Sequence, residues 1–139
     1  VGSGPFRPVA AGRIEDHVMD AERYELKEES AAVIEKTRAA GGRIVAVGTT
    51  SVRVLESCVD SGGVVRAGAG ETRLFLSPGS RFQVVDALMT NFHLPRSTLL
   101  MLVSAFAGRE RILGLYAEAL AEGYRFYSYG DAMFLSRGR

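Results

Sequence analysis

The sequence predicts an α/β fold, with a partly parallel sheet, flanking helices and a β-hairpin. Residues 44–47 form a short β-branched run, which is typical of a strand buried on both faces. Residues 48–51 then lead directly into a helix through Val52 and Leu55, and such strand–turn–helix units build partly parallel sheets. The chain has 139 residues, 47% of them hydrophobic, which is enough for a buried core. We therefore expect one domain over residues 1–139.

The other elements follow from local patterns. Alternation, apolar runs and turn clusters predict strands at residues 24–27, 72–76, 82–85, 86–90 and 126–129. Residues 77–80 are turn formers and would join two of these strands into the hairpin. Helical spacing and caps predict helices from Ser30 to the glycine pair 41–42, from Ser97 or Thr98 to residue 107, and over residues 112–120.

Composition restricts the class of protein. The longest apolar run, residues 99–106, is interrupted by Ser104 and is too short to span a bilayer. The single Cys58 has no internal partner, so a reducing cytoplasm is expected. The net charge is +1, but residues 36–81 contain seven basic and three acidic residues, a distribution that favours contact with phosphate or a plain solvated surface. The chain begins at Val1, which we interpret as a fragment or a split product.

The turn at residues 48–51 is a candidate anion site. Free N–H groups at a helix N-terminus, together with the helix dipole, favour phosphate or carboxylate. The hydroxyls of Thr49, Thr50 and Ser51 add donors, and Arg53 adds a charged one. The alternative is simple helix capping by Thr50 or Ser51. The segment is not a P-loop, because it lacks the lysine and the glycine spacing.

Two further side chains are candidates for proton transfer. His93 lies in an expected loop between a strand and a capped helix, and Asp131 follows the last expected strand. A histidine near neutral pKa can act as acid or base, and ligands bind at the carboxyl ends of strands in α/β sheets. The alternatives are a structural histidine and an aspartate that caps a turn. His17 and His93 are far apart, so the sequence contains no metal signature.

Four ordered blocks then resemble the motifs of one enzyme family. Residues 48–53 read GTTSVR and are followed by Glu56 and Ser57. The other blocks are GETRLF with a following PG and Phe82 at residues 70–82, DALMTNFHLPRSTL at residues 86–99, and YRFYSYGDAM at residues 124–133. Together they are similar to the S-adenosylmethionine:tRNA ribosyltransferase-isomerases of queuosine biosynthesis, and the chain resembles the C-terminal part of these enzymes.

The resemblance implies a transferase and isomerase that uses S-adenosylmethionine as substrate. The ribosyl moiety would be transferred to preQ1 at the wobble position of tRNA, which gives epoxyqueuosine and releases adenine and methionine. The resemblance further implies no permanently bound cofactor and no metal, a cytoplasmic enzyme without a membrane partner, and a barrel-like α/β domain with an all-β domain inserted upstream. The missing N-terminal part of the same enzyme would then be a partner of this chain.

This chemistry suggests roles for residues in the matching blocks. A base would take a C5′ proton beside the sulfonium and an acid would protonate the leaving adenine, with His93 and Asp131 as candidates whose roles stay unassigned. Phe92, Tyr127 and Tyr129 are available to face the sulfonium cation. The methionine carboxylate would suit residues 49–51. The full set of expected substrate-binding residues is Thr49, Thr50, Ser51, Arg53, Asn91, Phe92, Ser97, Thr98 and Tyr129.

Two departures from the family pattern lie near the N-terminus. Pro5 stands where the family usually has a threonine, and Asp20 stands where it usually has a second histidine. These departures leave open that the acceptor of the ribosyl group is a molecule other than tRNA with preQ1. The second reading is therefore a non-catalytic fragment or diverged relative that binds S-adenosylmethionine or a protein partner.

Overall fold

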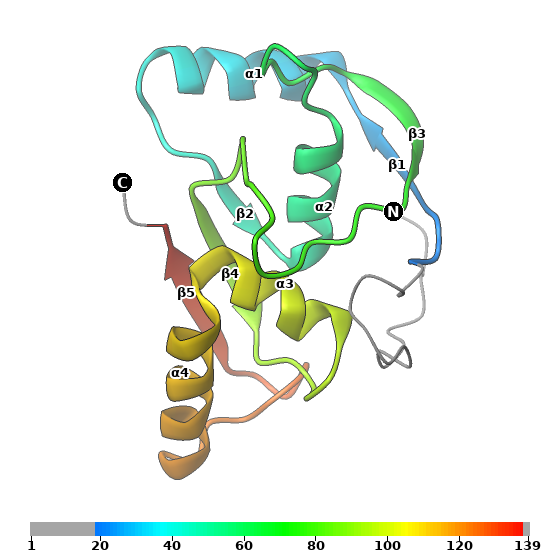
Figure 1. The fold of residues 1–139 in the computed structure, drawn as a ribbon. Helices are drawn as coiled ribbons and strands as arrows, with labels where there is room; N and C mark the ends of the chain where they lie inside the picture. The colour runs from blue at the N-terminus through cyan, green and yellow to red at the C-terminus, as the bar shows by residue number, and fades with distance from the viewer. Residues whose placement is uncertain (1–18, 138–139) are drawn as a thin grey trace.

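The computed structural model describes residues 19–137, which form four helices and two small sheets (Figure 1). Pro5 and His17, on which the sequence analysis commented, lie outside the described residues. The elements in chain order are β1 (Glu22–Leu26), α1 (Glu28–Ala39), β2 (Val45–Val47), α2 (Thr49–Ser57), β3 (Gly68–Thr72), β4 (Ala87–Asn91), α3 (Thr98–Ala107), α4 (Arg109–Ala121) and β5 (Ala132–Ser136).

The main sheet has the order β2-β4-β5 and confirms the α/β prediction. β2 runs parallel to β4, and β5 is antiparallel to β4. A parallel pair needs a long crossover, and the chain between β2 and β4 supplies it with α2 and β3. The second sheet pairs β1 with β3 in antiparallel register. Within residues 19–137 the strands do not close into a barrel.

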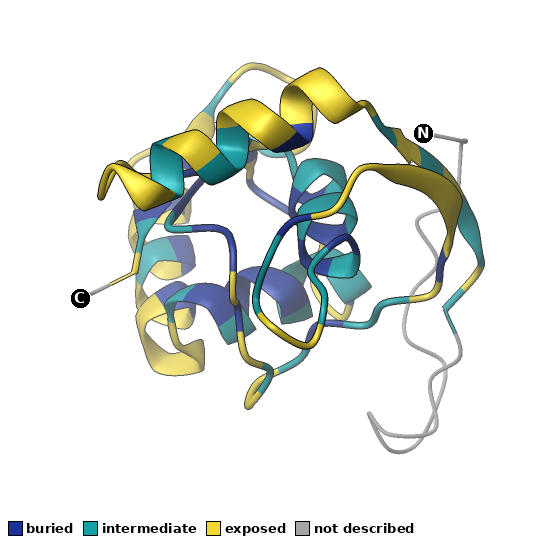
Figure 2. Ribbon diagram, turned by 90° about the horizontal axis from the view of Figure 1, so that it is seen from above, coloured by how far each residue is buried: buried dark blue, intermediate teal, exposed yellow. Residues whose placement is uncertain are grey.

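The larger core lies between the main sheet and the α3–α4 helix pair. Leu88 and Leu135 of the sheet are fully buried, together with Val103 of α3 and Ile112 of α4. A smaller cluster packs under α1, which contributes Ala31 as its one buried residue and is otherwise largely exposed (Figure 2). No helix in the described part of the chain is long and apolar enough to cross a membrane.

The other face of the main sheet is open, which corrects one prediction. Val45 and Val47 of β2 are 48% and 68% exposed, so β2 is not buried on both faces. In the sheet register Val47 pairs with Met89, and Met89 pairs with Phe134, which is also exposed. Within residues 19–137 no element covers this apolar row. The β-branched run predicted the strand correctly but could not reveal which face is covered.

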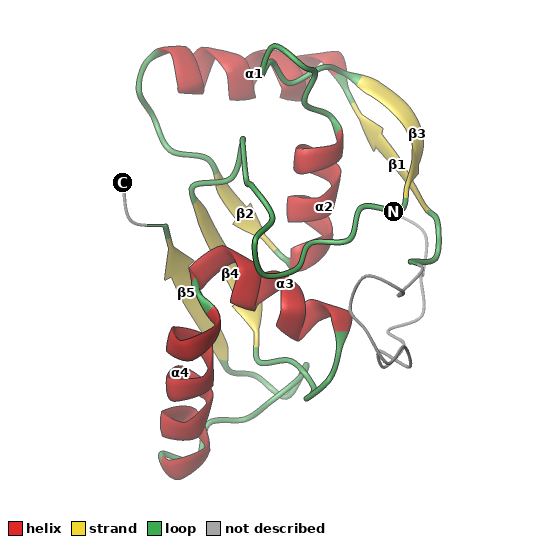
Figure 3. Ribbon diagram, viewed as in Figure 1, coloured by secondary structure: helices red, strands yellow, loops and turns green. Residues whose placement is uncertain are grey.

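The predicted hairpin at residues 72–85 is wrong. β3 ends at Thr72, and a loop runs from there to β4 (Figure 3). The buried carboxylate of Glu56 in α2 accepts the N–H groups of Gln83, Val84 and Val85 at 2.8, 3.0 and 2.9 Å. Successive N–H groups of an extended strand point to opposite sides, so three consecutive N–H groups that converge on one carboxylate do not fit a hairpin strand. Glu56 therefore holds this segment as an irregular loop whose apolar side chains still reach the core.

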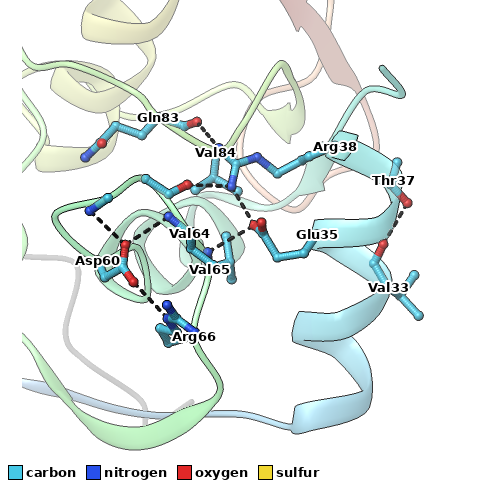
Figure 4. A network of polar contacts seen from close by, with 12 residues as sticks. Val33, Glu35, Thr37, Arg38, Asp60, Val64, Val65, Arg66, Gln83 and Val84 are labelled. Atoms are coloured by element: carbon cyan, nitrogen blue, oxygen red, sulfur yellow. Dashed lines mark hydrogen bonds and ion pairs between the residues drawn. The ribbon is translucent and has the colours of Figure 1, made fainter. Parts of the chain in front are cut away.

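A polar network joins the loop after α2 to α1 (Figure 4). Glu35 pairs with Arg38 and accepts the N–H of Val65, and the Val65 hydrogen bond is the main cause that lowers the pKa of Glu35. Arg38 also donates to the carbonyl oxygens of residues 63 and 83, at 2.8 and 3.2 Å. Asp60 accepts the N–H groups of residues 62 and 64 and pairs with Arg66. The network attaches residues 60–66 to α1, and Val65 of this loop also packs in the smaller core cluster.

Helix and strand ends differ from the predictions in two places. Lys27, not Ser30, is the N-cap of α1, so Ser30 lies within the helix. Residues 126–129 form a turn rather than a strand, and the last strand begins after Asp131. Ser97 is confirmed as the N-cap of α3, because its Oγ accepts the N–H of Leu100 at 3.1 Å.

Candidate functional site

A cavity of about 580 Å³ opens at the carboxyl ends of β2 and β4. Because these two strands are parallel, the loops that follow them meet at the same edge of the sheet, where α/β folds bind ligands. The size lies within the range of small-molecule sites. The lining residues are Gly48, Thr49, Thr50, Thr90, Asn91, Phe92, His93, Leu94, Pro95, Ser97, Leu99, Tyr127 and Ser128.

The N-terminus of α2 forms one wall of the cavity. Gly48 is the N-cap, and its φ of 87° is a conformation that favours glycine. No side chain at the N-cap accepts a hydrogen bond from the first N–H groups of α2, and the first turn of the helix contains no acidic residue. Thr49 and Thr50 line the cavity, whereas Ser51 turns back and donates its hydroxyl to the carbonyl of Val47 at 2.8 Å. The helix dipole and the first-turn N–H groups can therefore favour an anion in the cavity.

His93 is a buried residue of the cavity wall and is held at two points. Its Nε2 lies 3.1 Å from the Thr90 hydroxyl, and its backbone N–H donates to the Tyr116 hydroxyl at 2.7 Å. Burial lowers the pKa of His93 to about 4. The imidazole is therefore neutral at pH 7, with Nε2 engaged by Thr90 and Nδ1 as the second ring nitrogen. Which nitrogen carries the proton depends on the tautomer.

The buried histidine predicts a pH dependence of stability. In the unfolded chain His93 binds a proton near pH 6.5, whereas the folded protein resists protonation until about pH 4. The unfolded state therefore holds the extra proton between these values, and the free energy of unfolding falls as pH drops from about 6.5 to 4. The full effect is roughly 3 kcal/mol. Urea unfolding of the wild type and His93→Gln at pH 7 and pH 5 should show a smaller loss in the variant; equal losses would contradict the assignment.

Phe92 connects the cavity to an aromatic cluster. Its ring stacks on Phe126 at 5.0 Å between centroids, and it meets Tyr116 and Tyr124 edge-on at 5.4 and 5.8 Å. The carbonyl of Phe92 accepts the N–H of Tyr127 at 2.9 Å, which brings Tyr127 to the cavity. Only 5% of Phe92 is exposed, so its ring is mainly a packing element with one edge at the cavity.

Several residues expected from the sequence do not line the cavity. Arg53 is buried in α2, where Nη1 pairs with Glu22 at 2.8 Å and Nε donates to the Leu74 carbonyl at 3.0 Å. Its Nη2 is buried and has no hydrogen-bond partner among the described residues. Four more expected site residues also do not line the cavity: Ser51, Thr98, Tyr129 and Asp131.

Asp131 braces a turn beside the cavity. Its Oδ2 accepts the backbone N–H of Arg125 at 2.6 Å and lies 3.6 Å from the Arg125 Nε. Its carbonyl oxygen accepts from the side-chain amide of Asn91 at 3.3 Å. Asp131 thus holds the turn in place in this structure. Its link to the cavity is the hydrogen bond with Asn91, which is a lining residue.

Sequence reasoning missed residues that only the fold brings together. Thr90 stands three residues before His93, a spacing that could have suggested the contact. Tyr116 lies in α4, 23 positions after His93, and nothing in the sequence connected the two. Gly48, Leu94, Pro95, Leu99 and Ser128 complete the cavity wall. Among the described residues, no group of three or more His, Cys, Asp or Glu side chains is placed to hold a metal ion.

Comparisons with known proteins identify relatives over almost the whole chain. An S-adenosylmethionine:tRNA ribosyltransferase-isomerase of Thiobacillus denitrificans is 61% identical over 137 residues, 99% of this chain and 40% of that protein. The corresponding enzyme of Dechloromonas aromatica is 58% identical, over 99% of this chain and 39% of that protein. The crystal structure of the S-adenosylmethionine tRNA ribosyltransferase of Thermotoga maritima matches with a TM-score of 0.74 and 49% identity, over 81% of this chain and 40% of that one.

The chain thus spans about 40% of the length of the relatives that it matches. The family model described as "Queuosine biosynthesis protein" matches residues 1–135. This match covers all four motif blocks and both parallel strands that form the cavity. The chain therefore belongs to the queuosine biosynthesis protein family.

Proposed function

We propose that this chain is the part of an S-adenosylmethionine:tRNA ribosyltransferase-isomerase that holds the S-adenosylmethionine cavity. The enzyme transfers the ribosyl moiety to preQ1 in tRNA and isomerises it to epoxyqueuosine. The observation that carries the proposal is the cavity itself, which is built from the motif segments after β2 and β4 and the turn at residues 127–128. We place the enzyme in the cytoplasm, where its tRNA substrate is, and treat residues 1–139 as one domain.

The cavity offers complementary groups for each part of the substrate. The carboxylate of the methionine moiety suits the N-terminus of α2 at Thr49 and Thr50. The apolar wall of Leu94, Pro95 and Leu99 suits the adenosyl moiety. Tyr127 lies at the edge of the cavity, where an aromatic face attracts the sulfonium cation.

The proton transfers fall to His93 in this arrangement. It lines the cavity, and its neutral imidazole can accept or donate a proton at Nδ1 while Nε2 stays on Thr90. Asp131 is bonded to the Arg125 N–H outside the cavity lining, so we assign it the positioning of the neighbouring turn. The single imidazole then serves both the C5′ proton and the leaving adenine, directly or through water.

The test uses the full-length protein with S-adenosylmethionine and tRNA that carries preQ1. Release of adenine and methionine, with epoxyqueuosine appearing in digested tRNA by mass spectrometry, is the expected result. Binding of S-adenosylmethionine without release of adenine would overturn the enzyme proposal in favour of a non-catalytic binding protein.

The proposed carboxylate site at α2 predicts that one substitution weakens substrate binding without lowering the melting temperature. In the full-length protein, Thr50→Asp should raise the Kd for S-adenosylmethionine at least about 10-fold, because the new carboxylate repels that of the substrate. The same change should leave the melting temperature unchanged or slightly higher, because an acidic residue in the first turn favours the helix dipole. Ser51→Asp is the matched control, since Ser51 does not line the cavity. Equal effects on binding in both variants, or none in either, would contradict the site.

A further inference from the structure

The turn between α4 and β5 displays two tyrosines beside the cavity. Tyr127 is 40% exposed and lines the cavity, while Tyr129 is 71% exposed and lies one residue beyond the lining residue Ser128. Their ring centroids are 6.3 Å apart, with the planes at 73°. Large aromatic side chains this exposed do not contribute to the core, so the packing of residues 19–137 does not explain Tyr129.

The turn is braced so that both rings stay in place. Arg125 and Asp131 close it through the 2.6 Å hydrogen bond from backbone N–H to carboxylate. The Tyr127 N–H is bonded to the Phe92 carbonyl, and Phe126 stacks on the Phe92 ring. The tyrosines are therefore held on a support that is anchored in the core, and little rotational freedom of the turn would be lost on binding.

Two unusual backbone conformations occur in segments that contribute to the cavity wall. Tyr127 and Arg96 are the two non-glycine residues with positive φ among the described residues, at 59° and 56°. Such conformations cost about 1–3 kcal/mol each and concentrate at ligand-binding segments. Arg96 is exposed, follows the lining residue Pro95, and has no ion-pair partner within residues 19–137. The cavity edge thus combines exposed aromatic rings with an unpaired cation.

We propose that Tyr129, supported by Tyr127 and with Arg125 in the same turn, is a docking surface for an unstacked nucleotide of a single-stranded RNA loop, and that Arg96, next to the cavity-lining Pro95, contacts a phosphate of that loop. Proteins recognise such loops by stacking the splayed bases on aromatic rings and by pairing arginine with the phosphates. Tyr129 supplies the exposed face, and the side chain of Arg125 is 69% exposed beside it in the same turn. Stacking of one nucleotide on Tyr129 at the edge of the cavity would then position the neighbouring nucleotide so that its base enters the cavity. The inference rests on the proposed function, because it takes tRNA as the partner.

The experiment measures RNA binding separately from chemistry in the full-length protein. The probe is a fluorescently labelled tRNA anticodon stem-loop, titrated by anisotropy with Tyr129→Ala, Tyr129→Phe and the wild type. Loss of one stacking contact should raise the Kd for the stem-loop about 5- to 100-fold in Tyr129→Ala. Tyr129→Phe keeps the ring and should stay within about twofold of wild type. Binding of S-adenosylmethionine and the melting temperature should be unchanged in both.

Arg96 adds a second readout. Arg96→Ala should weaken stem-loop binding and reduce the slope of log Kd against log salt by about one, as expected for one lost phosphate contact. Arg111→Ala, an exposed arginine in the first turn of α4 that does not line the cavity, should change neither value.

Two results would overturn the inference. An unchanged stem-loop Kd in Tyr129→Ala shows that no base stacks there. A lowered melting temperature with unchanged RNA binding shows that the remainder of the longer enzyme covers Tyr129 instead. Either outcome is distinct from failure of the proposed function. In that case the wild type would release no adenine, whereas its Kd for the stem-loop could still be measured.

Discussion

His93→Ala in the full-length enzyme is expected to lower turnover roughly 10²- to 10⁴-fold, the usual range for a lost acid or base. Among the lining residues within the described range 19–137, His93 is the one titratable side chain besides the phenol of Tyr127. The Kd for S-adenosylmethionine should change far less than turnover, because the helix N-terminus and the apolar wall that we propose to bind it remain. Turnover is measured as adenine release under saturating substrate, and binding by calorimetry.

His93→Asn separates chemistry from positioning. Asparagine keeps a hydrogen-bonding side chain near Thr90 but cannot shuttle a proton near neutral pH. A proton-transfer role predicts a loss close to that of His93→Ala. Full activity in His93→Asn, with only a lower melting temperature in His93→Ala, would show that the imidazole merely holds the loop after β4.

Glu56→Ala is expected to lower the free energy of unfolding by about 3 kcal/mol or more. The change leaves three backbone N–H groups without their acceptor, two of them buried at Val84 and Val85, and each orphaned group costs about 1–3 kcal/mol. Urea unfolding followed by circular dichroism measures the difference.

The matched control for Glu56 is an exposed carboxylate in an ion pair. Glu71 pairs with Arg23 at 3.2 Å, and both side chains are more than half exposed, so Glu71→Ala should stay within about 0.5 kcal/mol of wild type. Glu56→Gln keeps one acceptor oxygen and should fall between the two. A loss below about 1 kcal/mol in Glu56→Ala would show that the loop rebonds its N–H groups elsewhere.

The elements that depend on local chemistry can be predicted from the sequence. β2 followed by α2 was predicted from a β-branched run and a glycine turn, because φ preferences and side-chain branching act within a few residues. The Ser97 cap and the Gly108 break between α3 and α4 follow from the same kind of signal. The sequence named Thr49, Thr50 and His93 as separate candidates, and the parallel pairing of β2 with β4 places them in one cavity wall.

Features that depend on partners far apart in the chain follow from the three-dimensional packing and not from local patterns. The segment at residues 82–85 looks like a strand, yet Glu56 from another element takes its N–H groups and prevents the hairpin. Arg53 and Asp131 looked like ligands for a substrate, yet Glu22 engages Arg53 and the Arg125 N–H engages Asp131. The low pKa of His93 comes from burial against residues far along the chain. Hydrogen bonding and desolvation act through space, so a pattern along the chain does not contain them.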